Sequence, residues 1–247
     1  MSARARGIVL AWHPFREHSQ ILRILTSDGK ISLLAKGALR ARGRRWYGGY
    51  EPGDEIAFLY YARPRGGLHL MGEARFDSVR PLLRRSLAAW GAMLYGLCLA
   101  DTLTVGEDPN GAPYIPLSGF LDDLEAGCEP RLCALALEAE LLRNGGFLPG
   151  LEACPGCGGA WSGGAARATV APGIACPRCA RSPRRVAEDG VDLLRRLADG
   201  ADVSDASVHA ALEGAVRLSG WLLLAVLGRM PRGRRFAYGA MHREEAA

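Results

Sequence analysis

The sequence lacks the short motifs by which many nucleotide-using and hydrolytic enzymes are recognised. It contains no G-x-x-x-x-G-K-[ST] phosphate loop, no G-x-G-x-x-G that opens a helix after a strand, no G-x-S-x-G and no H-E-x-x-H. The five histidines are scattered as single residues, so none belongs to a partner motif. These absences argue against an enzyme and favour a protein that acts by binding.

Long hydrophobic runs are also missing. The stretch from Leu87 to Ala100 is nearly uncharged, but it stops at Asp101 after 14 residues and is too short to span a bilayer. Residues 1–7 hold two arginines, and the apolar run behind them is only about five residues long, which predicts no secretory signal. With 247 residues, 49% of them hydrophobic, we expect a cytoplasmic protein of one or two domains and no membrane partner.

Two cysteine pairs stand out against this background. Cys154 and Cys157 form one C-x-x-C element, Cys176 and Cys179 form another, and 18 residues separate the two. Each short loop can turn two sulfurs toward one ion, and a tetrahedron needs two such loops. The spacing therefore predicts a zinc site made by four thiolates.

Two disulfides or four free thiols are the alternative reading of the pairs, and the expected reducing cytosol argues against disulfides. Four cysteines close the coordination shell of zinc, whereas a catalytic zinc keeps one position open. A nucleobase deaminase would also need an H-x-E before its P-C-x-x-C, and none is present. We therefore expect the zinc to be structural.

The remaining cysteines are Cys98, Cys128 and Cys133, and they lie singly in the sequence. Cys98 and Cys133 fall within helical patterns, where a cysteine is most often a small buried hydrophobe. No function is assigned to these three residues.

Positive charge is concentrated in the first third of the chain. Residues 1–85 hold 16 Lys or Arg and 7 Asp or Glu, whereas the remaining residues hold 15 and 19. The segment from Lys36 to Arg45 contains five cations in ten residues, and Trp46 and Tyr47 follow it. Cations with glycines and aromatic residues beside them suit phosphate contacts and base stacking. A solvated loop is the alternative, and an Arg-rich coding bias weakens the count without explaining its position.

Around this segment the hydrophobic pattern is that of β-strands. Asp28-Gly29 between two apolar runs is a hairpin signal, because the tight turn needs positive φ. The predicted strands are residues 7–12, 20–26, 30–35, 54–61 and 68–79. Five short strands in about 80 residues fit an oligonucleotide/oligosaccharide-binding (OB) barrel. An SH3-like barrel without a ligand is the alternative.

In an OB barrel, the connections between strands one and two and between strands four and five flank the ligand groove. The first connection holds Arg16 and His18, and the second holds Arg63 and Arg65. The predicted DNA-binding residues are therefore basic residues of these connections and of the basic segment, with one aromatic residue: Arg16, Lys36, Arg40, Arg42, Arg44, Arg45, Trp46, Arg63 and Arg65.

After Pro81 the period changes to that of helices. Leu83, Leu87, Trp90, Leu94, Leu97 and Asp101 fall on or near one face, which predicts a core-facing helix. Further helices are predicted at 118–125, 130–144, 190–198 and 204–227, with Ser204 as N-cap. The prediction is thus an α+β protein in three parts: an OB-fold domain over 1–80, an all-α domain over 81–228 with a zinc finger inserted at 151–182, and a basic, flexible tail over 229–247.

Several motifs together resemble the RecO family of bacterial recombination mediators. They are Gly7-Ile8-Val9-Leu10, Glu17-x-Ser19, Thr26-x-x-Gly29-Lys30, Lys36-Gly37-Ala38 and Gly146-Phe147-Leu148-Pro149-x-Leu151-x-x-Cys154-x-x-Cys157-Gly158. The resemblance covers residues 7 to about 180, and the combination is more specific than any one motif.

The resemblance implies an N-terminal DNA-binding barrel, a helical domain with a zinc site, and no catalytic centre. It further implies that the chain binds single- and double-stranded DNA and anneals complementary strands. The implied partners are RecR, the C-terminal tail of single-stranded DNA-binding protein and, indirectly, the RecA recombinase that the protein helps to load. Some members of the family lack the four cysteines, which implies that zinc is structural.

Two other classes of protein share some of these features. An NAD-dependent DNA ligase pairs such a barrel with a four-cysteine finger, but it needs a Lys-x-Asp-Gly that neither Lys30 nor Lys36 begins. A zinc-containing RNA-binding or transcription adapter would show the same basic segment and the same cysteines.

Overall fold

The structure is a computed structural model of the chain. It describes residues 2–39, 49–63, 67–104, 113–151, 153–159, 166–168, 174–176, 178–179, 185–201, 203 and 207–239. The chain forms two compact units, one of residues 1–127 with 235–247 and the other of residues 128–234. The predicted domain boundaries after residues 80 and 228 stay predictions.

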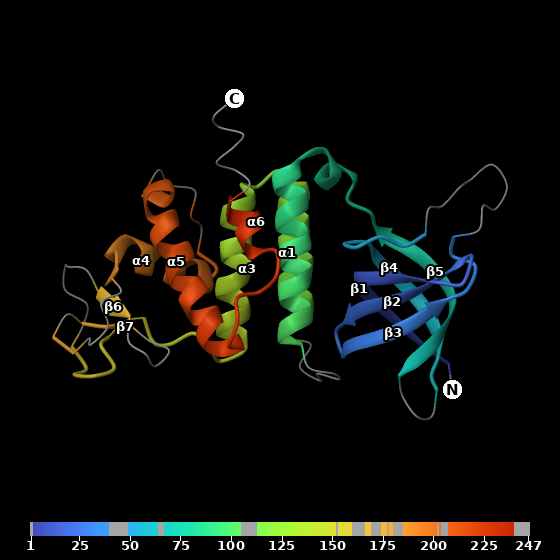
Figure 1. The fold of residues 1–247 in the computed structure, drawn as a ribbon, viewed down its shortest axis with the longest axis horizontal. Helices are drawn as coiled ribbons and strands as arrows, with labels where there is room; N and C mark the ends of the chain where they lie inside the picture. Colours follow the sequence, from blue (N-terminus) through green and yellow to red (C-terminus); the bar gives the residue numbers. More distant parts are fainter. Residues whose placement is uncertain are drawn as a thin grey trace. The chain divides into compact units, whose positions relative to one another are not determined.

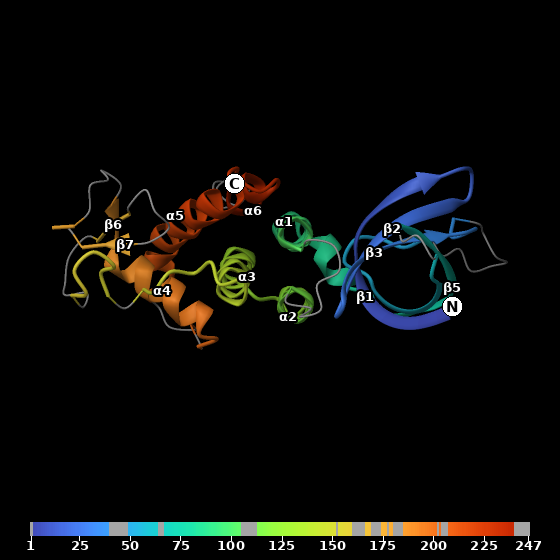
Figure 2. The same ribbon diagram turned by 90° about the horizontal axis from the view of Figure 1, so that it is seen from below.

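A closed five-stranded barrel forms the start of the first unit (Figure 1). Its strands are β1 (Ser2–Phe15), β2 (Ser19–Thr26), β3 (Gly29–Ala35), β4 (Glu55–Tyr61) and β5 (Leu68–Ser78). Their order is β1-β2-β3-β5-β4; β3 and β5 pair in parallel, and β4 closes the ring on β1. Figure 2 shows the strands curving round this ring. The predicted OB barrel is confirmed.

The turn between β2 and β3 shows why the Asp-Gly signal works. Gly29 has a φ of 109°, a conformation that residues with a Cβ rarely adopt. The hydroxyl of Thr26 accepts a hydrogen bond from the backbone N–H of Asp28 (3.1 Å) and donates one to the carbonyl of Gly29 (2.9 Å). The predicted hairpin is confirmed, and its turn is closed by a side chain as well as by the backbone.

The barrel core consists of the inward-facing residues of all five strands. Its buried members are Val9, Leu22, Ile24, Leu33, Ala35, Ile56, Phe58 and Met71. Each large apolar side chain contributes about 1.5–3 kcal/mol when it is fully removed from water. At Gly7 a Cβ would lie 2.5 Å from Ile24 Cγ2, so the close approach of β1 to β2 requires a glycine.

A 3₁₀ turn, η1 (Pro81–Arg85), and two helices, α1 (Leu87–Leu103) and α2 (Tyr114–Glu125), complete the described part of the first unit up to Gly127. The predicted core face of α1 is partly wrong, because Leu87 and Leu94 are 56% and 41% exposed whereas Leu83 and Leu97 are buried. The helix is apolar on nearly all sides and buries alanines, glycines and Met93 as well. A helix that is apolar all round has no single period-3.6 stripe to identify its buried face.

Arg80 joins the barrel to α2 within this unit. Its side chain is 3% exposed, and its guanidinium donates to the carbonyl of Gly53 (2.9 Å), to Asp122 Oδ1 (2.7 Å) and to Glu55 Oε2 (3.4 Å). The hydroxyl of Tyr114, at the start of α2, donates to the other oxygen of Glu55 at 2.7 Å. One buried cation therefore fixes the start of β4, the end of β5 and α2 together.

The second unit contains three long helices and a small sheet. Its elements are α3 (Pro130–Asn144), α4 (Glu188–Ala198), α5 (Ser207–Leu227) and the short strands β6 (Ala166–Ala168), β7 (Ile174–Ala175) and β8 (Arg185–Val186), in the sheet order β7-β6-β8. The bounds of α3 are those predicted. The carboxylate of Glu129 accepts from the N–H groups of Arg131 (3.1 Å) and Leu132 (2.7 Å) and so caps the helix. Ser204, the predicted N-cap of α5, lies outside the described residues.

Cys128 and Cys133 bracket the first turn of α3, and the structure joins them in a disulfide. Cys133 is buried, as predicted, whereas Cys128 and Cys98 are half-buried. The sequence analysis treated all three as separate residues. A five-residue spacing without a recognised motif had given no reason to pair two of them.

α5 is long and apolar enough to cross a membrane by length and composition alone, with a mean hydropathy of 1.5 over residues 208–227. Half of that stretch is buried within the protein, and the core helix of a soluble protein has the same composition. The sequence predicts a helix over residues 204–227, in which Glu213 and Arg217 interrupt the apolar residues.

The predicted flexible tail is wrong as far as Gly239, because α6 (Arg234–Gly239) is a formed helix. Arg234 is buried and donates to both carboxylate oxygens of Glu138 on α3 (2.8 and 3.0 Å), and to the hydroxyl of Ser219 on α5 (2.9 Å). At Gly220 a Cβ would lie 2.8 Å from this guanidinium, so a glycine makes room for it. Residues 240–247 of the predicted tail lie outside the described residues.

We predict that Arg234→Ala lowers the free energy of unfolding by about 3–5 kcal/mol, because it leaves the carboxylate of Glu138 buried without its guanidinium partner. Urea denaturation measures the effect. Arg235→Ala is the matched control, since Arg235 is the exposed neighbour and its loss should cost no more than about 0.5 kcal/mol. The double variant Arg234→Met/Glu138→Leu should recover most of the loss. Equal stability of the two single variants would contradict the prediction.

Candidate metal centre and nucleic-acid interface

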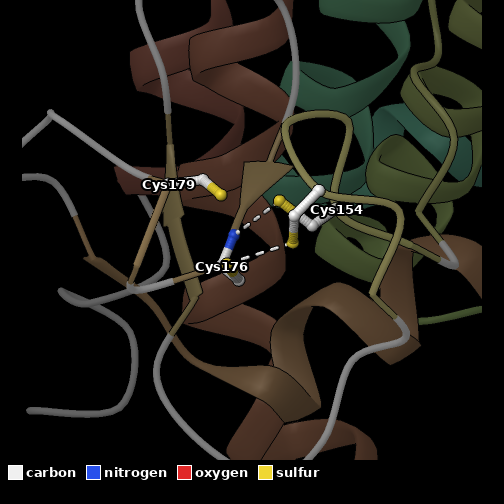
Figure 3. Close-up of side chains that lie close together, drawn as sticks. Cys154, Cys176 and Cys179 are labelled. Atoms are coloured by element: carbon white, nitrogen blue, oxygen red, sulfur yellow. Dashed lines mark hydrogen bonds between the residues drawn. The ribbon is translucent and has the colours of Figure 1, made fainter.

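The four predicted cysteine ligands come together in the second unit. The sulfurs of Cys154, Cys157, Cys176 and Cys179 all lie within 4.8 Å of one another, and those of Cys157 and Cys176 are 3.8 Å apart. A tetrahedron with metal–sulfur bonds of about 2.3 Å has sulfur–sulfur edges of about 3.8 Å. Figure 3 shows the sulfurs of Cys154, Cys176 and Cys179 turned toward one another. The cluster fits a single tetrahedral metal ion.

Local backbone contacts shape both cysteine loops. In the first loop, the N–H of Cys154 donates to the carbonyl of Gly159 (2.9 Å), and Gly158, with φ 68°, donates back to the carbonyl of Cys154 (2.8 Å). In the second, the N–H of Cys179 donates to the carbonyl of Cys176 at 3.0 Å. At Gly156 a Cβ would lie 3.0 Å from the Cβ of Cys179, so a larger residue there would push the two loops apart.

The environment favours a thiolate at one sulfur and resists it at another. The backbone N–H of Cys176 donates to Cys154 Sγ at 3.3 Å (Figure 3) and, with the N–H groups of Gly156 and Cys157, lowers the pKa of Cys154 to about 6. The neighbouring sulfurs, first that of Cys176, raise the pKa of Cys179 to about 12. Four thiolates in this space therefore need a cation to offset their charge.

The cations of the barrel fall into two groups. Those of the first group are paired with carboxylates of the same unit. Arg23 and Lys30 lie 3.0 and 3.1 Å from Asp101 of α1, and Arg6 and Arg75 lie 2.6 and 3.3 Å from Asp77 of β5. Their charge is offset within the protein, so these four residues are poor candidates for contacts with phosphate.

The cations of the second group are exposed and form no ion pair with any carboxylate in the described part of the chain; they are Arg4 on β1 and Arg16, Lys36 and Arg63 on the connections. Arg16 and Lys36 belong to one end of the barrel, because Gly37 N donates to Ser19 Oγ (3.2 Å) and Leu39 N donates to the carbonyl of His18 (3.0 Å). The segment that begins at Lys36 is thereby attached to the β1–β2 connection.

Arg63 lies at the other end of β1. Ser2 pairs with Tyr61, just before Arg63, whereas Phe15 pairs with Ser19, just after the β1–β2 connection. The structure therefore brings Arg16 and Lys36 together. The backbone N–H of Arg63 donates to His69 Nδ1 (3.1 Å), and His69 pairs with Leu33, three residues before Lys36, so Arg63 lies beside the same strand β3. Arg40, Arg42, Arg44, Arg45, Trp46 and Arg65 lie outside the described residues, so the DNA-binding assignment of all nine residues stays a prediction.

Two features of this surface were missed by the sequence analysis. Among the described non-glycine residues, Arg16 alone has a positive φ, of 54°. Its guanidinium lies 5.4 Å from the ring centroid of Phe15. Tyr61 is 49% exposed at the end of β4, two residues before Arg63. The sequence does contain a signal for the exposed Tyr61, because a tyrosine stands at the last position of a predicted strand. Nothing in the sequence indicates the strained backbone of Arg16.

The described residues combine an OB barrel, a fold found in many proteins that bind oligonucleotides, with a four-cysteine cluster that could hold a metal ion. Comparison with known proteins identifies the family. The model of the family "Recombination protein O N terminal" matches residues 1–78, and that of "Recombination protein O C terminal" matches residues 84–235. The chain belongs to the RecO family of DNA repair proteins.

Proteins named DNA repair protein RecO are similar over most of the chain. That of Anaeromyxobacter dehalogenans (strain 2CP-1 / ATCC BAA-258) is 34% identical over 213 residues, which cover 83% of this chain and 82% of the relative. Those of Geobacter sulfurreducens and Symbiobacterium thermophilum are 32% and 30% identical, over 78% and 87% of this chain and 79% and 84% of their own length. The resemblance found in the sequence is therefore confirmed.

We predict that Cys154→Ser removes the bound metal and lowers solubility, because the surrounding loops and two- or three-residue strands have little core of their own. Mass spectrometry of the intact protein and elemental analysis measure the metal. Cys98→Ser, at a cysteine outside the cluster, is the control and should keep it.

Protons compete with the ion for the thiolates, and the raised pKa of Cys179 makes this competition strong, so acidification should release the metal. Protein purified without chelator that contains no metal would contradict the prediction.

A second prediction uses the left-handed backbone of Arg16. Arg16→Gly and Arg16→Ala remove the same charge, but only glycine relieves a conformation that costs other residues about 1 kcal/mol. The glycine variant should therefore be more stable than the alanine variant by about that amount in urea denaturation. Both variants should lose the same affinity for single-stranded DNA in fluorescence anisotropy. Equal stability of the two would show that the backbone at Arg16 is unstrained.

Proposed function

We propose that the protein is a non-enzymatic mediator of DNA repair and recombination that binds single- and double-stranded DNA and anneals complementary strands. The observation that carries the proposal is the separation of the barrel cations, with Arg16 and Arg63 left unpaired on the two connections that flank an OB groove and Lys36 left unpaired next to the first of them. Contacts with phosphate hold a strand without reading its bases, so two bound strands stay free to pair. Screening of their mutual repulsion then accelerates annealing.

We further propose that the ion held by the cysteine cluster is zinc and that it is structural. Four thiolates in a tetrahedron are a donor set that zinc prefers, and they leave no position for a substrate or an activated water. Zinc would supply rigidity to residues 151–182 and no chemistry.

Family membership supports the partners of the proposal. The chain would act in the cytoplasm, at the nucleoid during repair, together with RecR. Through the C-terminal tail of single-stranded DNA-binding protein it would reach coated strands, and with RecR it would assist the loading of RecA. A zinc-containing RNA-binding or transcription adapter is the second candidate, since the same cations and cysteines suit it. The adapter would bind strands without accelerating their pairing.

We predict that the protein accelerates annealing of short complementary DNAs without ATP or Mg²⁺, because the sequence offers no phosphate-binding loop to couple hydrolysis to motion. The rate should fall as salt rises. It should persist when the strands are coated with single-stranded DNA-binding protein. Stopped-flow fluorescence of labelled strands measures it. An unchanged rate at concentrations where both strands are bound would contradict the mediator and leave the adapter.

The control for this experiment is the triple variant Arg42→Glu/Arg44→Glu/Arg45→Glu. The logarithm of affinity for single strands falls with the logarithm of salt by about 0.7 per phosphate neutralised, so the variant should show a shallower slope and weaker binding to all sequences alike. DNA and RNA oligonucleotides of matched sequence complete the test. The mediator should bind without preference for a base sequence and should accelerate the annealing of the DNA strands.

A further inference from the structure

A cavity of about 540 Å³ opens in the first unit where the barrel meets α1, and the functions described so far do not use it. Its volume lies within the range of pockets that hold small ligands. The walls come from the segment before β4, the end of β5, η1 and α1. The lining residues are Gly49, Glu51, Pro52, Gly53, Asp54, Phe76, Val79, Arg80, Pro81, Arg84, Trp90 and Met93.

Flat surfaces form the sides of this cavity. Phe76 is 37% exposed, and its ring packs against that of Tyr50, with the ring centroids 5.3 Å apart. In the same lining, the guanidinium of Arg84 lies 5.6 Å from the ring centroid of Trp90. Aromatic rings and guanidinium planes are the groups on which proteins stack the bases of single-stranded nucleic acids.

Acidic groups line another part of the cavity. Asp54 is buried, and its Oδ2 accepts a hydrogen bond from the backbone N–H of Glu51 at 2.8 Å. Burial raises the pKa of Asp54, which shows how little water reaches it. Carboxylates repel phosphate but accept hydrogen bonds from the amino groups on base edges. Arg80, the buried cation of the lining, is already engaged by Gly53, Glu55 and Asp122, and the guanidinium of Arg84 lies over the ring of Trp90, so the lining offers planar groups and hydrogen-bond acceptors that suit a base.

The cavity also lies next to the basic segment along the chain. Gly49, one of its lining residues, comes four residues after Arg45, the last cation of the segment that begins at Lys36. The chain leaves that segment through Tyr50, which is fixed because Gln20 Oε1 accepts from its N–H (2.9 Å) and Gln20 Nε2 donates to its carbonyl (3.1 Å). Leu39, three residues after Lys36, also lies close to Gly49, so a strand whose phosphate binds Lys36 would pass near the cavity.

From these observations we propose that the cavity receives one unstacked nucleobase of a bound DNA strand, held between Phe76 and the Arg84–Trp90 pair. The proposal rests on the proposed binding of single-stranded DNA and adds to it a contact with a base. The captured base is withdrawn from its neighbours, so the strand bends at that point and the bases beside it are exposed for pairing. Capture requires no base sequence, because every base has faces that stack.

The test compares a 20-nucleotide deoxycytidine oligomer (the cytidine oligomer) with an abasic deoxyribose oligomer of the same length, using the full chain and fluorescence anisotropy at one salt concentration. Phe76→Leu keeps an apolar side chain but removes the flat ring. It should weaken binding to the cytidine oligomer by about tenfold, since stacking on one aromatic residue contributes about 1–3 kcal/mol, and leave binding to the abasic oligomer unchanged. Circular dichroism and urea denaturation check that the variant is folded.

Arg84→Gln and Arg85→Gln form the matched pair. Both residues are exposed on η1 and carry the same charge, but only Arg84 lines the cavity. Arg84→Gln should weaken cytidine binding more than Arg85→Gln does, and the two should act equally on the abasic oligomer. If wild type binds both oligomers and Phe76→Leu and Arg84→Gln leave their ratio unchanged, the cavity holds no base and the DNA-binding proposal survives. If wild type binds neither oligomer, both proposals fail.

Discussion

The buried guanidinium of Arg80 is the contact on which the arrangement of the first unit depends. It donates hydrogen bonds to the carbonyl of Gly53 and to Glu55 at the start of β4, and to Asp122 on α2, which is far from both in the sequence. Truncating such a residue is costly, because the carboxylate of Glu55 then stays buried without this cation. The N–H groups of Arg80 must find acceptors when they are buried. This makes the arrangement specific, because a different placement of the barrel and α2 would leave the cation unpaired.

The same principle distributes the other cations of the barrel. Asp101 at the end of α1 neutralises Arg23 and Lys30, and Asp77 neutralises Arg6 and Arg75. An ion pair of this kind adds little to stability where it is exposed, but it removes the cation from the set that attracts phosphate. A count of the basic residues along the chain therefore overstates the number of cations available to bind phosphate. The cations left for phosphate in the described part of the barrel are those without an ion pair, which are Arg4 on β1 and Arg16, Lys36 and Arg63 on the connections.

Much of the fold could be predicted because its signals are local. The Asp28-Gly29 turn, the alternation around it and the proline-initiated helix at Pro130 each depend on a few neighbouring residues, and all three were placed correctly. The cysteine cluster could also be predicted from local signals. Each C-x-x-C loop sets the geometry of its own two sulfurs, so the fold need only bring the two loops together. Features that depend on burial were predicted less well. α1 is apolar on nearly every side, so the sequence could not indicate that Leu87 and Leu94 would stay exposed.

Contacts between residues distant in sequence explain the remaining differences. Arg234 lies in a stretch rich in arginine and glycine, and its composition indicates a solvated tail; its burial depends on Glu138, 96 positions earlier, and on the space left by Gly220. The cavity beside Arg84 has the same origin, because its walls come from four segments of which none carries a motif. A charged residue is thus assigned to the interior or to a ligand only when its partners are known. In this chain the partners of the arginines, more than their number, separate those that hold the fold from those available for the proposed contact with DNA.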